Sequence, residues 1–154
     1  TRRGNRHPSI VPYETYAAAD RELAVATGND RIFARLCAAL GLDELPDDER
    51  FATNEARVAN VDALAEALEG VLRTRNADEW VRALTDAGVP AGPINEVDEA
   101  FALAERLGME PVAEHDGVPL VRPPLRVGGE RPPIRYGPPR LDEHGEELRA
   151  WLSR

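Results

Sequence analysis

Apolar and polar residues alternate near the start of the chain, in a pattern that predicts two strands joined by a turn. Residues 10–18 and 22–27 carry β-branched, aromatic and alanine side chains at alternating positions, as half-buried strands do. Asp20 and Arg21 supply the polar turn between the two segments. Pro12 cannot donate to a neighbouring strand, so it places the first strand at a sheet edge. The pattern therefore predicts an antiparallel hairpin.

A capped amphipathic helix is predicted directly after this hairpin. Gly28 ends the second strand, and the Asn29 side chain can accept a hydrogen bond from the first unpaired amides of a helix. Gly41 stands where a left-handed residue commonly ends a helix. The apolar residues between them recur at spacings of three and four, so they share one face that packs on the hairpin. They are Ile32, Phe33, Leu36, Cys37 and Leu40.

Two further helical segments follow a polar connection that contains Pro46. Residues 55–75 repeat apolar side chains with a 3.6-residue period, and Asn60 marks a break between a short helix and a long one. Asn76 and Glu79 form the pattern of a capping box for the next helix. Trp80 belongs to its apolar stripe, which makes a core position more probable than a ligand platform.

Proline and glycine divide the second half of the chain. Residues 89–95 read as a rigid loop, because two prolines restrict the backbone. Asn95 is the expected N-cap of a helix that ends at Gly108. Asp116 and Gly117 favour a type I′ turn between two short strands.

The last part of the chain is rich in proline and lacks long helical patterns. Residues 125–127 predict a short strand, and residues 131–141 an extended arm. A final short helix is expected from Asp142 to about Leu152, with an apolar stripe that includes Trp151. A helix of this length is marginal without packing partners.

Together these elements predict an α+β fold. A small, mainly antiparallel sheet with several amphipathic helices is followed by a proline-rich arm and a C-terminal helix. We expect a small domain over residues 1–108 and a hairpin, return arm and helix over residues 109–154. The chain starts at Thr1 and shows no signal-peptide pattern, so we interpret it as a cytoplasmic piece of a longer protein.

Charge and composition exclude several classes of function. The formal net charge is −9, which argues against a nucleic-acid surface because phosphates require a basic patch. A cluster of Arg2, Arg3 and Arg6 is the local exception. No apolar run approaches the length of a membrane span. Cys37 is the single cysteine, so no intrachain disulfide is possible, and its place on the apolar helix face predicts a buried thiol.

The sequence contains no complete catalytic constellation. It has no glycine-rich phosphate loop with a lysine, no metal-binding spacing of Cys or His, and no GxSxG motif. His7, His115 and His144 are scattered over loops and strand edges. We therefore predict no metal site within these 154 residues.

Several ordered motifs resemble those of the family III CoA-transferases, the CaiB/BaiF group. They are GNRHPSIVPY from Gly4, GNDRIFARLCAALG from Gly28, RFATNEARVAN at 50–60, AGVPAGPIN at 87–95 and PPRLDEH at 138–144. Two positions depart from the family pattern. Arg21 stands where the family usually has a glycine, and residues 141–145 read LDEHG in place of LGEHT.

The resemblance implies an acyl-CoA:carboxylate CoA-transferase. In that family an aspartate attacks the acyl-CoA thioester, and an aspartyl anhydride and an enzyme–CoA thioester follow. This aspartate lies in a large domain upstream, and the chain resembles only the small domain and the returning C-terminal segment. The implied ligands are acyl-CoA and a carboxylic acid, with CoA as a substrate and no prosthetic group. The full-length enzyme is expected to be an interlocked homodimer, and the present chain alone to be inactive.

The resemblance also indicates which residues face the substrate. Asn5, His7, Tyr13 and Glu14 are the candidates, and Glu14 is the one candidate for a direct part in the chemistry. The alternative for each is a packing, turn-capping or surface role. Two other functions stay open: the small domain of a 2-methylacyl-CoA racemase, in which a proton is abstracted next to the thioester, and a free-standing interaction domain.

Overall fold

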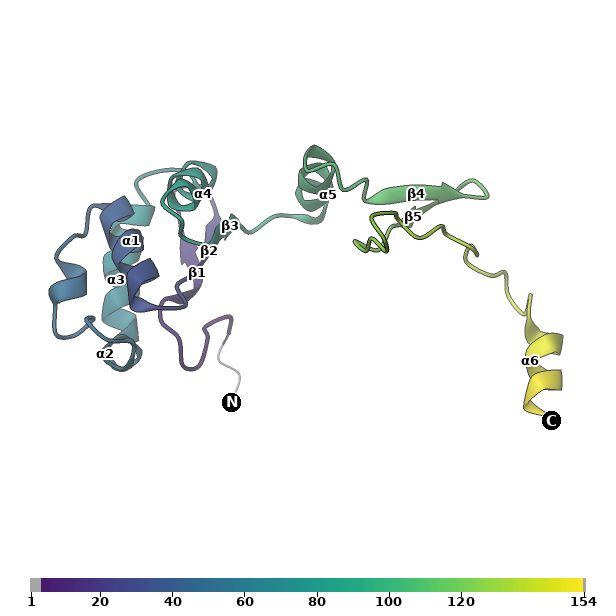
Figure 1. The fold of residues 1–154 in the computed structure, drawn as a ribbon, viewed down its shortest axis with the longest axis horizontal. Helices are drawn as coiled ribbons and strands as arrows, with labels where there is room; N and C mark the ends of the chain where they lie inside the picture. The colour runs from purple at the N-terminus through teal and green to yellow at the C-terminus, as the bar shows by residue number, and fades with distance from the viewer. Residues whose placement is uncertain (1–3, 154) are drawn as a thin grey trace. The chain divides into compact units, whose positions relative to one another are not determined.

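The structure, a computed structural model, describes residues 4–153. Arg2 and Arg3 of the basic cluster lie outside these described residues. Within them, six α-helices accompany a three-stranded and a two-stranded antiparallel sheet, which confirms the α+β fold class (Figure 1). The chain forms two compact units, the first ending at Ile94 and the second beginning at Asn95. The helix predicted before Gly108 thus groups with the second unit.

The sheet of the first unit contains the predicted hairpin and a third strand. The strands are β1 (Tyr13–Ala17), β2 (Glu22–Ala26) and β3 (Ala91–Pro93), in the order β1-β2-β3. Both pairings are antiparallel, and β1 is an edge strand, as Pro12 predicted. The prediction of a rigid loop over 89–95 was wrong for residues 91–93, which form β3. A three-residue strand with glycine and proline has weak intrinsic propensity, and its pairing with β2 is decided by tertiary contact.

In Figure 1 the helices of the first unit lie to the left of its sheet and above it. Asn29 caps the first of them through a hydrogen bond from the Ile32 amide at 3.0 Å, and Gly41 ends it with φ 70°, as predicted. Asn76 and Glu79 form the predicted capping box. Asn60 does mark the break, but its side chain donates to the Arg50 and Ala56 carbonyls and makes no capping hydrogen bond to the longer helix. The bounds are α1 Asp30–Leu40, a 3₁₀ turn Leu45–Asp47, α2 Asn54–Ala59, α3 Val61–Leu72 and α4 Ala77–Asp86.

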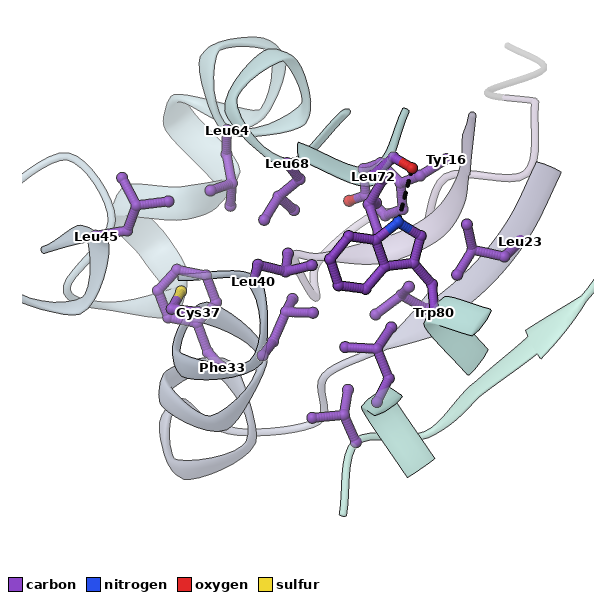
Figure 2. Close-up of a cluster of buried hydrophobic side chains, with 14 of the residues drawn as sticks. Tyr16, Leu23, Phe33, Cys37, Leu40, Leu45, Leu64, Leu68, Leu72 and Trp80 are labelled. Carbon is purple, nitrogen blue, oxygen red and sulfur yellow. Dashed lines mark hydrogen bonds between the residues drawn. The ribbon is translucent and has the colours of Figure 1, made fainter. Parts of the chain in front are cut away.

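The core of the first unit lies between its helices and the sheet. Figure 2 shows side chains from α1, α3, α4 and the hairpin converging on one cluster. Trp80 is 2% exposed and donates from its indole nitrogen to the Leu72 carbonyl at 2.8 Å, so the predicted core role is confirmed. Cys37 is also fully buried, and burial raises the pKa of its thiol to about 12. This cysteine is a packing residue and not a nucleophile.

The apolar face of α1 gives a first testable prediction. Leu36 is fully buried, whereas Arg35 beside it is exposed. Leu36→Ala should lower the free energy of unfolding by about 2–5 kcal/mol, the usual cost of deleting a buried leucine side chain. Arg35→Ala is the matched control and should cost no more than about 0.5 kcal/mol. Urea denaturation measures both, and equal losses would show that the helix face is assigned wrongly.

The turn of the hairpin holds the N-terminus of α4. The Asp20 carboxylate accepts a hydrogen bond from the Ala77 amide at 2.8 Å, and Arg21 pairs with Asp78 at 2.7 Å. The Ala77 amide lowers the pKa of Asp20, because an unpaired helix N–H favours the charged carboxylate. Arg21, which departs from the family pattern, therefore has a contact of its own.

This lowered pKa predicts an acid dependence of stability. A carboxyl group whose pKa is lower in the folded chain stabilises the fold above its ordinary pKa of about 4, and this contribution is lost as pH falls through the folded value. Asp20→Asn should therefore reduce the loss of stability between about pH 4 and pH 2. Urea melts of both proteins at several pH values measure it. If Asp20→Asn loses as much stability at low pH as the unsubstituted protein, this role is contradicted. Asp98 is exposed, and Asp98→Asn is the control.

None of the described side chains of the second unit is fully buried. Its elements are α5 Val97–Arg106, β4 Val112–His115, β5 Val118–Val121 and α6 Gly145–Leu152. Asp116 and Gly117 have φ of 51° and 76°, which confirms the type I′ turn.

The cap of α5 is Glu96, with Glu99 completing a capping box, so the prediction of Asn95 was wrong by one residue. Residues 125–127 form no strand and contribute one isolated bridge from Val127 to Glu130.

The segment that follows α5 is held by an arginine from the proline-rich arm. Arg131 donates to the carbonyls of Gly108 at 2.9 Å and Glu110 at 3.3 Å, and also to that of Met109. The arm is therefore tied to residues 108–110, directly after α5.

The altered motif at 141–145 has a structural reason. Asp142 has φ 60°, a left-handed conformation that favours glycine. A Cβ at Gly145 would lie 1.8 Å from the Asp142 Oδ1, so the glycine leaves room for this carboxylate. Asp142 also pairs with Arg149 at 2.9 Å. The two changes compensate for each other, and α6 begins at Gly145, three residues later than predicted.

Candidate functional site

The four residues predicted to face substrate lie together at the edge strand β1. The loop before β1 returns along it, because the His7 amide donates to the Tyr13 carbonyl at 3.0 Å. The rings of His7 and Tyr13 are stacked, with centroids 5.1 Å apart and planes 8° apart. Asn5 bonds to Thr15 on the same strand, accepting from its amide at 3.3 Å and donating to its hydroxyl.

His7 fixes the loop through a ring nitrogen. Its Nδ1 accepts hydrogen bonds from the amides of Ser9 at 3.2 Å and Ile10 at 3.0 Å. An imidazole nitrogen that accepts carries no proton, so in this geometry the proton of the neutral ring is on Nε2. His7 therefore has the turn-capping role that was the alternative to substrate contact, while its Nε2 edge stays available.

Glu14 is the most constrained of the four. One carboxylate oxygen accepts from Arg6 Nε at 2.8 Å, and the other accepts from the Tyr16 hydroxyl at 3.3 Å. The side chain is only 9% exposed. Burial and the negative charge of Glu14 raise the pKa of the Tyr16 hydroxyl, so Tyr16 remains a neutral donor.

Arg6 connects this carboxylate to a helix. Its Nη1 donates to the Asp62 carboxylate on α3 at 2.8 Å, while its Nε holds Glu14. Both carboxylates raise the pKa of Arg6, with Glu14 the larger influence. The sequence singled out Arg6 only as part of a basic cluster and gave Tyr16 only a strand position. The role of Arg6 depends on partners 8 and 56 residues away, which no local pattern reveals. Tyr16 is two residues from Glu14 on β1, so the strand period of two places both on one face.

A small cavity of about 90 Å³ lies beside this network in the first unit. Its lining combines polar groups of the loop with apolar side chains from the helices. The lining residues are Arg6, His7, Pro8, Val11, Val58 and Val61. Among the described residues there is no group of three or more His, Cys, Asp or Glu that could hold a metal ion. What the site offers is hydrogen-bonding and charged groups at fixed positions.

Comparison with known proteins decides the family. A model of CoA-transferase family III matches residues 1–145. The chain belongs to CoA-transferase family III. It is 39% identical over 147 residues to the acetyl-CoA:oxalate CoA-transferase of Acetobacter aceti, covering 95% of this chain and 38% of that protein. It is 40% identical over 160 residues to the succinate–glutarate CoA-transferase of Agrobacterium fabrum, covering 99% and 39%.

Solved structures agree with this assignment. A CaiB/BaiF family protein from Brucella suis is 41% identical, with a TM-score of 0.76 over 99% of this chain and 40% of that one. A protein from Mycobacterium tuberculosis with 24% identity shares the fold, with a TM-score of 0.77 over 90% of this chain and 39% of that one. The chain thus spans about two fifths of the length of these relatives.

Within residues 4–153, no helix has the length and apolar character needed to span a bilayer.

Proposed function

We propose that this chain is the small domain and C-terminal segment of an enzyme that moves CoA between carboxylic acids. The relationship to named CoA-transferases over nearly the whole chain carries this proposal. The short coverage of those relatives supports a division of labour, in which the nucleophilic aspartate belongs to residues outside this chain. Glu14, the carboxylate at the candidate site, is held by Arg6 and Tyr16 within the same unit.

The proposed reaction divides one difficult transfer into easier steps. The upstream aspartate attacks the acyl-CoA carbonyl and expels CoA thiolate, which leaves an aspartyl–acyl anhydride. The thiolate then attacks the aspartyl carbonyl and releases the first acid, giving an enzyme–CoA thioester. The second acid attacks this thioester, and the same two steps run in reverse. The loop around Asn5 and His7 covers the reacting groups from the small-domain side, and two subunits interlock as a homodimer.

The racemase alternative is less well supported by the site. A group that exchanges a proton with substrate must be free to reach it. Both oxygens of Glu14 are hydrogen-bonded, and the side chain is almost buried. A carboxylate held in place by two donors suits an orienting role in CoA transfer better than proton exchange with a substrate. The third alternative, an interaction domain, is supported only by exposed apolar side chains among the described residues, most of them in residues 94–152.

Activity assays test the proposed function. Full-length enzyme containing this chain should exchange CoA between acetyl-CoA or succinyl-CoA and a dicarboxylic acid such as oxalate or glutarate, the acids named for its relatives. Residues 1–154 alone should show no turnover above the uncatalysed rate, because the nucleophile is outside them. Liquid chromatography of the acyl-CoA products measures both. Turnover by residues 1–154 alone would contradict the division of labour.

A second readout separates transfer from racemisation. In D₂O, a racemase exchanges the proton next to the thioester and incorporates deuterium there. A CoA-transferase forms new acyl-CoA without this exchange. Deuterium incorporation without CoA transfer would replace the proposed function with the racemase alternative.

A further inference from the structure

Arg6 contacts both the Glu14 carboxylate and a helix of the first unit. Arg6 is on the loop that carries Asn5 and His7, and its guanidinium bridges β1 and α3. The Glu14 side chain that pairs with Arg6 is 9% exposed, whereas the Asp62 side chain is 90% exposed. Solvent therefore screens the ion pair with Asp62 more than the ion pair with Glu14, and the contact with Glu14 is the stronger of the two.

The same guanidinium fixes two parts of the candidate site at once. Glu14 has two side-chain donors, and the Tyr16 hydroxyl at 3.3 Å is the longer contact. Without Arg6 the carboxylate would keep only this long bond in a nearly buried place. The loop would also lose one of its side-chain ties to β1 and keep the bonds of Asn5 to Thr15. The lost tie lies next to His7, whose Nδ1 holds the Ser9 and Ile10 amides.

We propose that Arg6 is a positioning residue for the CoA-transfer reaction. It orients the Glu14 carboxylate and holds the loop with Asn5 and His7 against β1, so that both present a fixed surface to the acyl group. This inference rests on the proposed function and adds a residue to its site. A guanidinium suits the role because Nε and Nη1 reach two acceptors in different directions, which a lysine ammonium on a flexible stem does not reproduce.

Steady-state kinetics of the full-length enzyme test the positioning role. Arg6→Gln should lower kcat by about 10-fold or more and change KM for acyl-CoA by less than about 3-fold, because misplacement of a site group affects the reaction more than ground-state binding. Arg6→Lys should recover part of kcat, since it keeps a charge near Glu14. Asp62→Asn, which removes only the exposed ion pair, is the matched control and should leave kcat within about 2-fold.

A double-mutant cycle shows whether Arg6 acts through Glu14. Glu14→Gln should itself lower kcat by more than it disturbs folding, and Arg6→Gln should lower kcat little further in the Glu14→Gln background. Losses in kcat that multiply would overturn the coupling. An unchanged kcat in Arg6→Gln would overturn the positioning role and leave Arg6 as a structural ion pair.

Hydrogen exchange separates this proposal from the proposed function. In residues 1–154, Arg6→Gln should speed exchange of the Ser9 and Ile10 amides by about 10-fold or more, because the loop opens locally, while Asp62→Asn should not. Unchanged exchange would overturn the anchoring of the loop. A full-length enzyme without any CoA transfer would overturn the proposed function and the positioning role with it, whereas the exchange result would still decide whether Arg6 anchors the loop.

Discussion

Arg57→Leu is expected to lower the free energy of unfolding of the first unit by about 3–5 kcal/mol, because it leaves buried carbonyl groups without partners. The Arg57 side chain is 1% exposed. It donates to the carbonyls of Val11 at 2.7 Å and Phe51 at 2.9 Å. Its guanidinium also lies 4.3 Å from the centre of the Phe33 ring.

Each of these contacts joins a different part of the fold. The Val11 carbonyl belongs to the segment entering β1, Phe51 precedes α2, and Phe33 is on α1. An unsatisfied buried carbonyl costs about 1–3 kcal/mol, and a desolvated cation over an aromatic ring contributes up to about 2 kcal/mol. Leucine fills part of the volume but replaces none of the hydrogen bonds. Urea denaturation followed by circular dichroism measures the loss.

The ion pair of Arg57 provides the control. Arg57 also donates to Asp30 at 2.6 Å, but the Asp30 side chain is 68% exposed. Asp30→Asn should therefore cost less than about 1 kcal/mol, as exposed ion pairs usually do. A loss for Asp30→Asn as large as that for Arg57→Leu would show that the charge pair matters more than the buried carbonyls.

Trp80→Ala is expected to cost about 3–5 kcal/mol, the range for removing a buried aromatic side chain. Trp80 joins α4 to the end of α3 through its hydrogen bond to the Leu72 carbonyl, and it fills the centre of the core shown in Figure 2. Trp80→Phe keeps most of the apolar volume and should cost about 1–3 kcal/mol, because the Leu72 carbonyl loses its indole donor.

A substitution of the neighbouring Arg75 separates the cation–ring contact of Trp80 from its packing in the core. Arg75 is exposed and lies 4.6 Å from the Trp80 ring centre. Arg75→Ala should cost no more than about 1 kcal/mol, the contribution of a cation over a ring at an exposed site. Thermal and urea unfolding of the three variants measure these values. An effect of Arg75→Ala equal to that of Trp80→Ala would show that the core assignment of Trp80 is wrong.

Local sequence determined the elements whose signals lie within a few residues. The N-cap at Asn29, the C-cap at Gly41 and the capping box at Asn76 satisfy helix ends with neighbouring groups, so they are readable from the chain. The type I′ turn at Asp116 and Gly117 requires a backbone conformation that few residues adopt. The apolar periodicity of α1 and α3 likewise predicted which faces are buried.

The candidate site was predicted less completely. The motif around His7 and Glu14 indicated where the site lies, and the structure brings those residues together at β1. It did not indicate that His7 holds two backbone amides or that Arg6 and Tyr16 occupy both oxygens of Glu14. A hydrogen bond forms between groups that the folded chain brings within bonding distance, and the sequence spacing of Arg6 and Glu14 does not show that they are so close.

Tertiary structure alone decided the features that depend on distant segments. The strand β3 exists because β2 offers free backbone groups to residues that have little strand propensity themselves. Arg57 is buried although helix periodicity gives no reason to expect an arginine in the core. Its charge is tolerated there because carbonyls from residues 11 and 51 and the carboxylate of Asp30 converge on it. The sequence by itself thus determined the helices, the hairpin and the family, whereas the polar contacts that join them arise only when segments far apart in the chain come together.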